Sequence, residues 1–185
     1  MGEGAALAAA ALREDGRAQM NLNRFFRHVV LGRNSVRRLF SKADLASIES
    51  AIRSAEQRHN GEIRFCVEGA LDSHELLAKL NARQRAVIVF SELGVWNTEH
   101  NNGVLLYLLL ADREFEIVSD RAVSRLVATE EWEKICREIE AEFKAGKFLD
   151  GVLLGIARIS EILAAHFPGP RSQRQELSDE AVVLP

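Results

Sequence analysis

The sequence lacks the signatures of common catalytic and metal sites. It contains no GxGxxG, GxxxxGK[ST], HExxH or GxSxG motif, so it predicts no standard phosphate-binding loop, zinc protease or hydrolase elbow. Its two cysteines, Cys66 and Cys136, stand far apart and show no CxxC or Cys/His spacing. We interpret both as packing residues in a reducing compartment rather than as a disulfide or redox pair.

Long apolar runs are also missing. No stretch reaches the roughly 20 apolar residues of a transmembrane helix. The alanine-rich run at residues 5–12 follows Glu3 and is short, which does not fit a cleaved signal peptide, and translation from Met20 is an open alternative. The net charge of -3 gives no general attraction to nucleic acid. We therefore expect a soluble, cytoplasmic protein that binds no nucleic acid.

What is present fits one globular domain with tails. The 185 residues are 47% apolar and 28% charged, as in ordinary soluble proteins. We predict an N-terminal extension with a basic arm at 1–40, an α/β domain at 41–167 and a flexible tail at 168–185. The apolar residues 181–184 leave open the alternative that the tail folds back as an edge strand.

A hairpin at residues 104–118 is the centre of the predicted fold. The unbroken apolar run at 104–110 is bounded by turn residues, which is typical of a strand buried on both faces of a sheet. A polar turn at 111–114 and a partly alternating segment at 115–118 complete the hairpin.

The flanking segments predict a mixed sheet covered by helices. Residues 62–68 alternate strictly and predict a strand parallel to the central one, joined to it by one crossover helix that begins at Asp72-Ser73 and runs through Ile88. A capping box formed by Ser41 and Asp44 opens an earlier helix that ends at Asn60-Gly61. Two later helices are predicted to be capped by Thr129 and Asp150.

Four polar residues are predicted to meet at one edge of this sheet. Parallel strands start at the same edge and the hairpin returns to it, so the topology brings together Glu62, Asn101, Asn102 and Asp120. Carboxylate and amide oxygens are the ligands that Ca²⁺ and Mg²⁺ prefer, so we predict a divalent-cation site there. The alternative is that the asparagines cap a turn and the acidic residues are solvated strand ends.

Two further residues are weak catalytic candidates. His100 is the histidine, of five, that lies beside this edge, and Arg121 follows Asp120. At the opposite end of the hairpin, Asp112 and Arg113 are explained by an ion pair within the turn.

The segment 21–39 is basic and aromatic. It predicts either an amphipathic helix whose arginines dock on an acidic protein partner or a membrane surface, or an arm whose apolar residues cover the sheet or a helix. We favour the covering arm. The apolar residues concerned are Phe25, Phe26, Val29 and Val30.

Several motifs of this sequence resemble signatures of the TPM domain family over residues 41–167. They are Asn102-Gly103-Val104-Leu105-Leu106, Leu109-Leu110-Ala111-Asp112-Arg113, Glu116-Ile117-Val118, and the turn Phe143-Lys144-Ala145-Gly146-Lys147-Phe148 with Gly151, accompanied by Glu62 and Trp96. The resemblance implies a three-layer α/β/α sandwich with a small mixed sheet and helices on both faces.

The resemblance also implies a range of activities. In this family a plant thylakoid branch is linked to photosystem II repair and acid phosphatase activity, an animal branch modulates an acetylcholine receptor, and some members bind calcium. Many bacterial members are exported and membrane-anchored, and this chain resembles a cytoplasmic relative. It departs from the exported pattern where Arg37-Arg38-Leu39-Phe40 replaces an aspartate and where Ser119-Asp120-Arg121-Ala122 replaces a glycine-rich segment.

Two functions follow from these residues. The favoured one is a non-catalytic interaction or regulatory module with a divalent-cation site, which binds a protein partner through the basic arm or the hairpin ends. The alternative is a metal-dependent phosphatase acting on phosphomonoesters, in which a cation on Glu62, Asn102 and Asp120 polarises a phosphoryl oxygen and Arg121 stabilises the developing charge.

Overall fold

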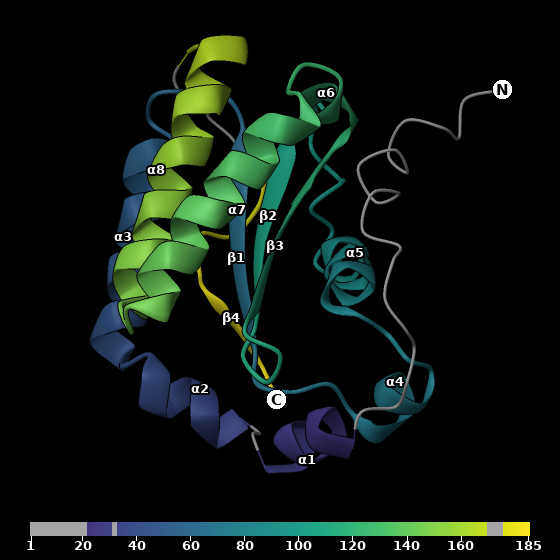
Figure 1. Cartoon of the computed structure of the whole chain (residues 1–185). Coiled ribbons are helices and arrows are strands. Elements are labelled where there is room, and N and C mark those ends of the chain that lie inside the picture. Colours follow the sequence, from purple (N-terminus) through teal and green to yellow (C-terminus); the bar gives the residue numbers. More distant parts are fainter. Residues whose placement is uncertain (1–21, 31–32, 170–175) are drawn as a thin grey trace, which may run out of the picture.

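The computed structural model describes residues 22–30, 33–169 and 176–185, and it has the predicted three-layer α/β/α architecture (Figure 1). One four-stranded mixed sheet, in the order β3-β2-β1-β4, lies between two layers of helices. The strands are β1 (Glu62–Glu68), β2 (Gly103–Leu109), β3 (Glu114–Ser119) and β4 (Val182–Leu184). The helices are α1 (Leu22–Val30), α2 (Arg33–Leu39), α3 (Lys42–Ala55), α4 (Ser73–Leu77), α5 (Ala82–Glu92), α6 (Arg121–Ser124), α7 (Thr129–Lys144) and α8 (Phe148–His166).

Strand β2 is the buried centre of the sheet, as its apolar run predicts. All seven of its residues are buried, and it pairs parallel with β1 and antiparallel with β3. Alternate side chains enter different cores because successive residues of a strand face opposite ways. Leu106 and Leu108 join the core under α3, α7 and α8, whereas Leu105 and Tyr107 join the core under α4 and α5.

The first long helix begins where the sequence predicts and ends earlier. The Ser41 hydroxyl accepts from the Asp44 N–H at 3.1 Å, and the Asp44 carboxylate accepts from the Ser41 N–H at 2.7 Å. This reciprocal capping box confirms the predicted start. Helix α3 stops at Ala55, several residues before the predicted end at Asn60-Gly61.

The single predicted crossover helix is wrong, because the chain forms two helices, α4 and α5. Lys79 takes a left-handed φ of 57°, and Asn81 then opens α5 with its own capping box. The new start changes which face of α5 points inward. Val87 and Ile88, at the end of the helix predicted from the sequence, are 45% and 37% exposed. The residues that α5 buries are Ala82, Ala86, Val89 and Phe90.

The predicted caps of the last two helices are also wrong. The N-cap residues are Ala128 for α7 and Lys147 for α8, and neither makes a side-chain cap hydrogen bond. Thr129 and Asp150 lie inside the first turns instead. An acidic residue in a first turn still interacts favourably with the positive end of the helix dipole, which accounts for Asp150.

The turn between α7 and α8 contains the family motif that runs from Phe143 to Phe148 and includes Gly151. Its packing explains why these residues occur together. Gly146 has a φ of 79°, which a side chain would strain. Phe143 stacks on Phe148 at 5.1 Å and meets Phe115 of β3 edge-on at 5.8 Å. A Cβ atom at Gly151 would lie 2.6 Å from the Phe143 ring. The motif therefore packs the helix pair onto the sheet.

The C-terminal segment forms the edge strand that the sequence left as an alternative. Strand β4 pairs parallel with β1, with Val183 opposite Val67. The N–H groups of Gly69 and Ala70 donate to the Pro185 carbonyl oxygen at 3.2 Å and 3.3 Å. The flexible tail favoured for 168–185 is therefore wrong for these last residues. Among the described residues, no helix has the length and apolar character to cross a membrane.

Candidate functional site

The register of the strands places the predicted cation ligands at one edge of the sheet. Glu62 begins β1 opposite Gly103, and the Asp120 N–H donates to the Gly103 carbonyl oxygen at 2.9 Å. Asn101 and Asn102 directly precede Gly103. The shared edge is thus confirmed, whereas their role as ligands stays a prediction. We call Asn101, Asn102, Asp120 and Arg121 the polar edge.

Glu62 is set apart from the polar edge by backbone. Gly103 lies between the strand positions of Glu62 and Asp120, and a Cβ atom there would lie 2.1 Å from the Val95 carbonyl oxygen. The loop before β2 therefore crosses directly over Gly103. The Glu62 carboxylate is 2% exposed and accepts from the Leu177 N–H at 3.4 Å. The C-terminal segment thus covers Glu62.

Asp120 carries the unusual group of the polar edge. As the N-cap of α6, its Oδ1 accepts from the Arg121 N–H at 2.6 Å. Its Oδ2 is buried and has no hydrogen-bond partner among the residues that the structure describes, and the residue is 5% exposed. A buried carboxylate oxygen without a partner is costly, so it is a group that a cation would stabilise.

The two asparagines also build the turn before β2. Asn101 has a left-handed φ of 52°, and its carbonyl oxygen accepts from the Ala122 N–H at 3.0 Å. Asn102 is 1% exposed and donates from its amide to the Asn60 carbonyl oxygen at 3.0 Å. The two asparagines therefore stabilise a turn, as the alternative prediction from the sequence states. This role does not prevent their side-chain oxygens from binding a cation.

Arg121 lies over this edge. One of its terminal nitrogens donates to Asn101 Oδ1 at 2.7 Å, and its Nε is 3.7 Å from Asp120 Oδ1, although the side chain is 69% exposed. His100 is exposed in the preceding turn. Within the described ranges, no group of three or more His, Cys, Asp or Glu side chains is placed to hold a metal ion. The donors here are one carboxylate and neighbouring amides.

Asp112, at the other end of the hairpin, has partners that the sequence did not reveal. The predicted ion pair with Arg113 is wrong, because Arg113 is exposed and Asp112 binds Arg24 of α1 at 2.8 Å and His28 Nε2 at 3.1 Å. Burial by itself would raise the pKa of the Asp112 carboxyl. Hydrogen bonds from His28 and Arg24 outweigh burial and lower that pKa to about 2.

These contacts fix the orientation of α1. Arg24 also donates to the Leu80 carbonyl oxygen at 2.7 Å, and His28 Nδ1 accepts from the Leu71 N–H at 2.9 Å. His28 Nε2 is then the nitrogen that donates to Asp112. The basic face of α1 thus points inward. The predicted covering arm is wrong in this respect, because the residues expected to cover the fold are exposed: Phe25, Phe26, Val29 and Val30.

A second buried charge cluster was also missed by sequence reasoning. Arg85 of α5 binds Glu68 at 2.9 Å and Glu75 at 3.1 Å, and the Tyr107 hydroxyl donates to Glu68. Burial raises the pKa of the Tyr107 hydroxyl and of the neighbouring Cys66 thiol. Cys66 is therefore held as an unreactive thiol, which agrees with its interpretation as a packing residue.

A buried serine–histidine pair has no access to substrate. His59 is 0% exposed and contacts the Gly61 carbonyl oxygen at 3.0 Å and Ser160 Oγ at 3.1 Å. Ser160 is also fully buried and accepts from Arg58 at 2.8 Å. This pair ties α8 to the chain before β1 and does not form a nucleophilic site.

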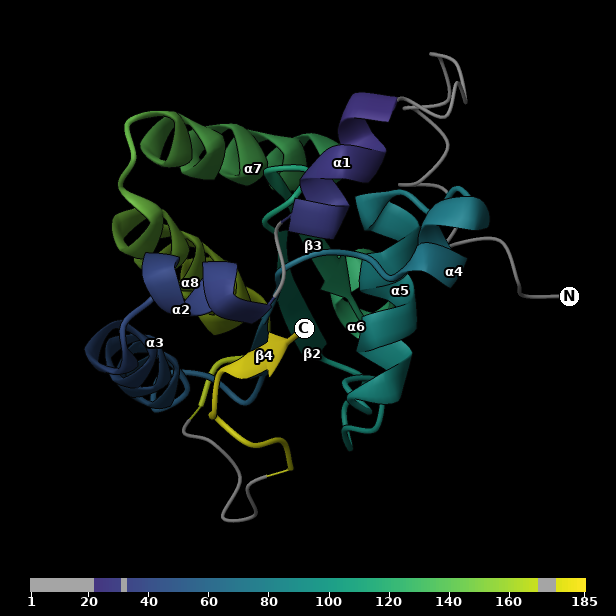
Figure 2. The same ribbon diagram turned by 90° about the horizontal axis from the view of Figure 1, so that it is seen from below.

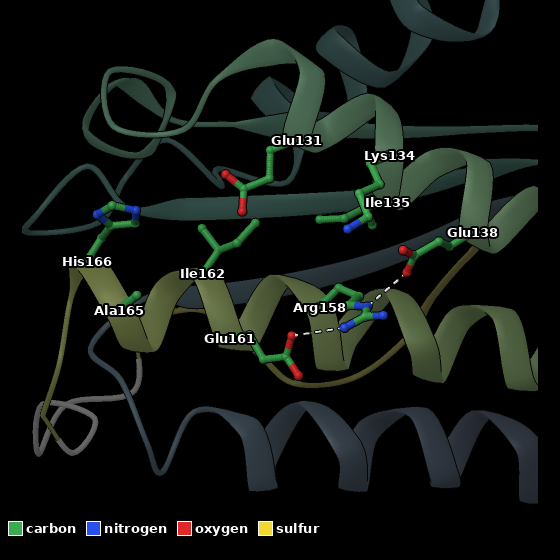
Figure 3. A pocket seen from close by; sticks show the side chains of 9 residues that line it. All are labelled: Glu131, Lys134, Ile135, Glu138, Arg158, Glu161, Ile162, Ala165 and His166. Atoms are coloured by element: carbon green, nitrogen blue, oxygen red, sulfur yellow. Dashed lines mark hydrogen bonds and ion pairs between the residues drawn. The ribbon is translucent and has the colours of Figure 1, made fainter.

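A groove between α7 and α8 holds surface ion pairs (Figure 3). Arg158 of α8 reaches Glu138 of α7 at 2.9 Å and Glu161 at 3.3 Å. Glu131, Lys134 and His166 also line this groove, but none of the residues of the polar edge does. Among the described residues, none of the groove's side chains has a buried oxygen without a hydrogen-bond partner, so the groove offers no counterpart to Asp120 Oδ2.

Comparisons with known proteins confirm the family resemblance. A family model described as the TPM domain matches residues 35–162. The NMR structure of BA42 protein from the psychrophilic bacterium Bizionia argentinensis is 30% identical, covers 78% of this chain and 94% of its own, and has a TM-score of 0.69. The N-terminal domain of a P. gingivalis protein shares the fold at 17% identity, with 74% and 83% coverage and a TM-score of 0.59. A search of curated proteins found no match.

Proposed function

Because this chain belongs to the TPM domain family, we propose that it is a non-catalytic interaction or regulatory module whose polar edge binds a divalent cation such as Ca²⁺ or Mg²⁺. The observation that supports the proposal is the buried Oδ2 of Asp120, to which no group in residues 22–30, 33–169 or 176–185 donates a hydrogen bond. Asp120 would supply the anionic oxygen, and Asn101 and Asn102 would supply amide oxygens. Such hard oxygen donors suit these two cations.

The charge balance of the polar edge supports this role. A cation at Asp120 offsets the desolvation of its carboxylate, which Arg121 does only from 3.7 Å and from the Oδ1 side. Arg121 is 69% exposed, so its side chain can move into solvent without breaking buried contacts. Binding of a cation and release of Arg121 are therefore compatible. The freed arginine and the cation would change the charge that a partner meets at this edge.

The same edge offers little for acid–base or nucleophilic chemistry. The hydroxyls of Ser119 and Ser124 lie 2.9 Å apart, and Ser124 also donates to backbone carbonyl oxygens of its own turn. Neither hydroxyl is paired with a base, as an activated nucleophile would be. A phosphatase remains the second candidate because Arg121 is placed at the edge to contact a phosphoryl oxygen.

Calorimetric titration with CaCl₂ and MgCl₂ tests the cation site directly. We expect one-to-one binding by the unaltered protein and loss of binding in Asp120→Asn. Asp72→Asn is the matched control, since Asp72 is also an N-cap aspartate but is exposed. An absence of heat with the unaltered protein, or equal heat in Asp120→Asn, contradicts the proposal.

Two further measurements separate the alternatives. We expect Glu62→Gln to keep cation binding, because the Val95 backbone and the C-terminal segment separate Glu62 from Asp120. Loss of cation binding in this variant would instead show that Glu62 is one of the ligands, as the sequence predicts. Phosphomonoesterase activity that requires both the cation and Asp120 would favour the phosphatase; its absence beside intact cation binding supports the module.

A further inference from the structure

Helix α1 presents its apolar face to solvent. Phe25 is 37% exposed, Phe26 61%, Val29 64% and Val30 74%. These four positions fall on one side of a helix with 3.6 residues per turn, opposite Arg24 and His28. Contiguous exposed apolar side chains on one helix are uncommon in monomers and mark an interaction surface.

The orientation of α1 is held by its buried face. Arg24 and His28 contact Asp112, whose side chain is 6% exposed. Rolling the helix over to bury its phenylalanines would leave the buried Asp112 carboxylate without the hydrogen bonds and the positive charge that it receives from α1, which is costly. The helix therefore keeps its apolar side outward.

Unpaired positive charge lies beside this apolar face. Arg37 and Arg38 of α2 are exposed, and no carboxylate among the described residues forms an ion pair with either. Residues 21–39 contain five arginines and no acidic residue, although the whole chain has a net charge of -3. Helices α1, α2 and α4 lie at the lower end of the molecule in Figure 1, and the view from below shows α1 between α2 and α4 (Figure 2). Leu77 of α4 is 68% exposed as well.

We propose that this end, defined by Phe25, Phe26, Val29, Val30, Arg37 and Arg38, docks on an anionic lipid bilayer. An amphipathic helix binds such a surface by burying its apolar side at the boundary between headgroups and acyl chains, while nearby arginines attract the lipid phosphates. The exposed side of α1 is a convex helix rather than a groove, which suits a soft, flat surface. This inference does not depend on the cation site.

Charge complementarity distinguishes the bilayer from a second copy of the chain. A two-fold interface would pair the same patch with itself. Both halves of that interface would then carry the arginines of residues 21–39, a segment without acidic residues, and bringing like charges together is unfavourable. An anionic surface instead meets both the apolar and the basic side chains favourably.

Vesicle co-sedimentation of the full chain tests the proposal. We expect binding to vesicles of phosphatidylcholine and phosphatidylglycerol in equal parts, and little binding to phosphatidylcholine alone. Arg37→Gln with Arg38→Gln should lower the partition coefficient by about thirtyfold, since each arginine near an anionic surface contributes about 1 kcal/mol. High salt should lower it in the same direction because it screens these charges.

The apolar contribution has a matched control. Phe26→Ser with Val30→Ser should abolish most vesicle binding, whereas Val87→Ser with Ile88→Ser, at the exposed apolar pair of α5, should leave it unchanged. Circular dichroism checks that each variant keeps the fold. The proposal is overturned by an absence of binding to anionic vesicles at low salt, or by equal binding of the Phe26 and Val30 variant. A dimer in sedimentation velocity that this variant dissociates would likewise overturn it, in favour of self-association.

Discussion

Asp112 and Asp120 stand at opposite ends of the same hairpin and differ in how their charge is satisfied. Both are nearly buried: the Asp112 side chain is 6% exposed and Asp120 is 5% exposed. Asp112 receives hydrogen bonds from Arg24 and His28, which come from a helix far away in the sequence. Asp120 uses one oxygen to cap α6, and its other oxygen has no partner in the described part of the chain.

The difference separates a structural carboxylate from an available one. The charge of Asp112 is compensated inside the chain, and it holds α1 in place, so a ligand would have to compete with an arginine and a histidine. Asp120 has the exposed Arg121 beside its Oδ1, and its Oδ2 has no partner within the described residues. At one end of the hairpin Asp112 thus holds α1 in place, whereas at the other end Asp120 is the residue of the proposed cation site (Figure 1).

The largest expected effect is that of removing Asp112. Asp112→Ala leaves Arg24 and His28 without their anion, and we expect it to lower the free energy of unfolding by about 2–4 kcal/mol. Urea unfolding monitored by circular dichroism measures this change. Arg113→Ala is the control, since the neighbouring Arg113 is exposed and should cost less than about 0.5 kcal/mol. Equal effects of the two substitutions on the free energy of unfolding would show that the contacts of Asp112 with Arg24 and His28 do not stabilise the fold.

The charge of Asp112 should also make the free energy of unfolding depend on pH. The pKa of Asp112 falls from an ordinary 3.8 to about 2 in the folded protein. A depressed pKa contributes stability that is complete above the unfolded value and is lost as the pH falls toward the folded one. The free energy of unfolding should therefore fall between about pH 4 and pH 2, less steeply in Asp112→Asn. Parallel curves for the two proteins would contradict the assignment.

Local patterns in the sequence predicted the parts of the fold that depend on near neighbours. The apolar run of β2 and the capping box of Ser41 and Asp44 each need only a few adjacent residues, and both were predicted correctly. The strand order then placed Asp120 at the edge with Asn102. The left-handed Lys79 has no sequence signature of its own, but the missed start of α5 has one, since Asn81 followed by Gln84 is a capping-box pattern.

Contacts between distant residues could not be predicted in the same way. Arg24 and Asp112 are 88 positions apart, and neither residue type indicates the other as its partner. Without that contact, the usual expectation is that phenylalanines turn inward and arginines outward. The reversed orientation of α1 follows from the need to neutralise a buried aspartate. The burial of Asp120 Oδ2, for which the described residues offer no partner, likewise follows from side-chain packing that a sequence pattern does not reveal.

Asp120→Asn should have the opposite sign to the change at Asp112. Asparagine is as good an N-cap as aspartate, and the substitution removes a buried charge. Without added cation, we expect the free energy of unfolding to stay unchanged or to rise by up to about 1 kcal/mol. The comparison with Asp112→Asn by urea unfolding decides the point. If both substitutions destabilise equally, Asp120 is a structural carboxylate as well, and the contrast between the two ends is lost.

The smallest effect on stability is expected for Arg121→Gln, which should also tighten cation binding. Arg121 is 69% exposed and its ion pair with Asp120 spans 3.7 Å, so its loss should change the free energy of unfolding by less than about 0.5 kcal/mol. The same substitution removes a positive charge that competes with a cation for Asp120. Calorimetry should therefore show tighter binding of Ca²⁺ or Mg²⁺ by Arg121→Gln, whereas Arg125→Gln, an exposed arginine at the end of α6, should bind as the unaltered protein does. Weaker binding would mean that Arg121 supports the site instead of competing with the cation.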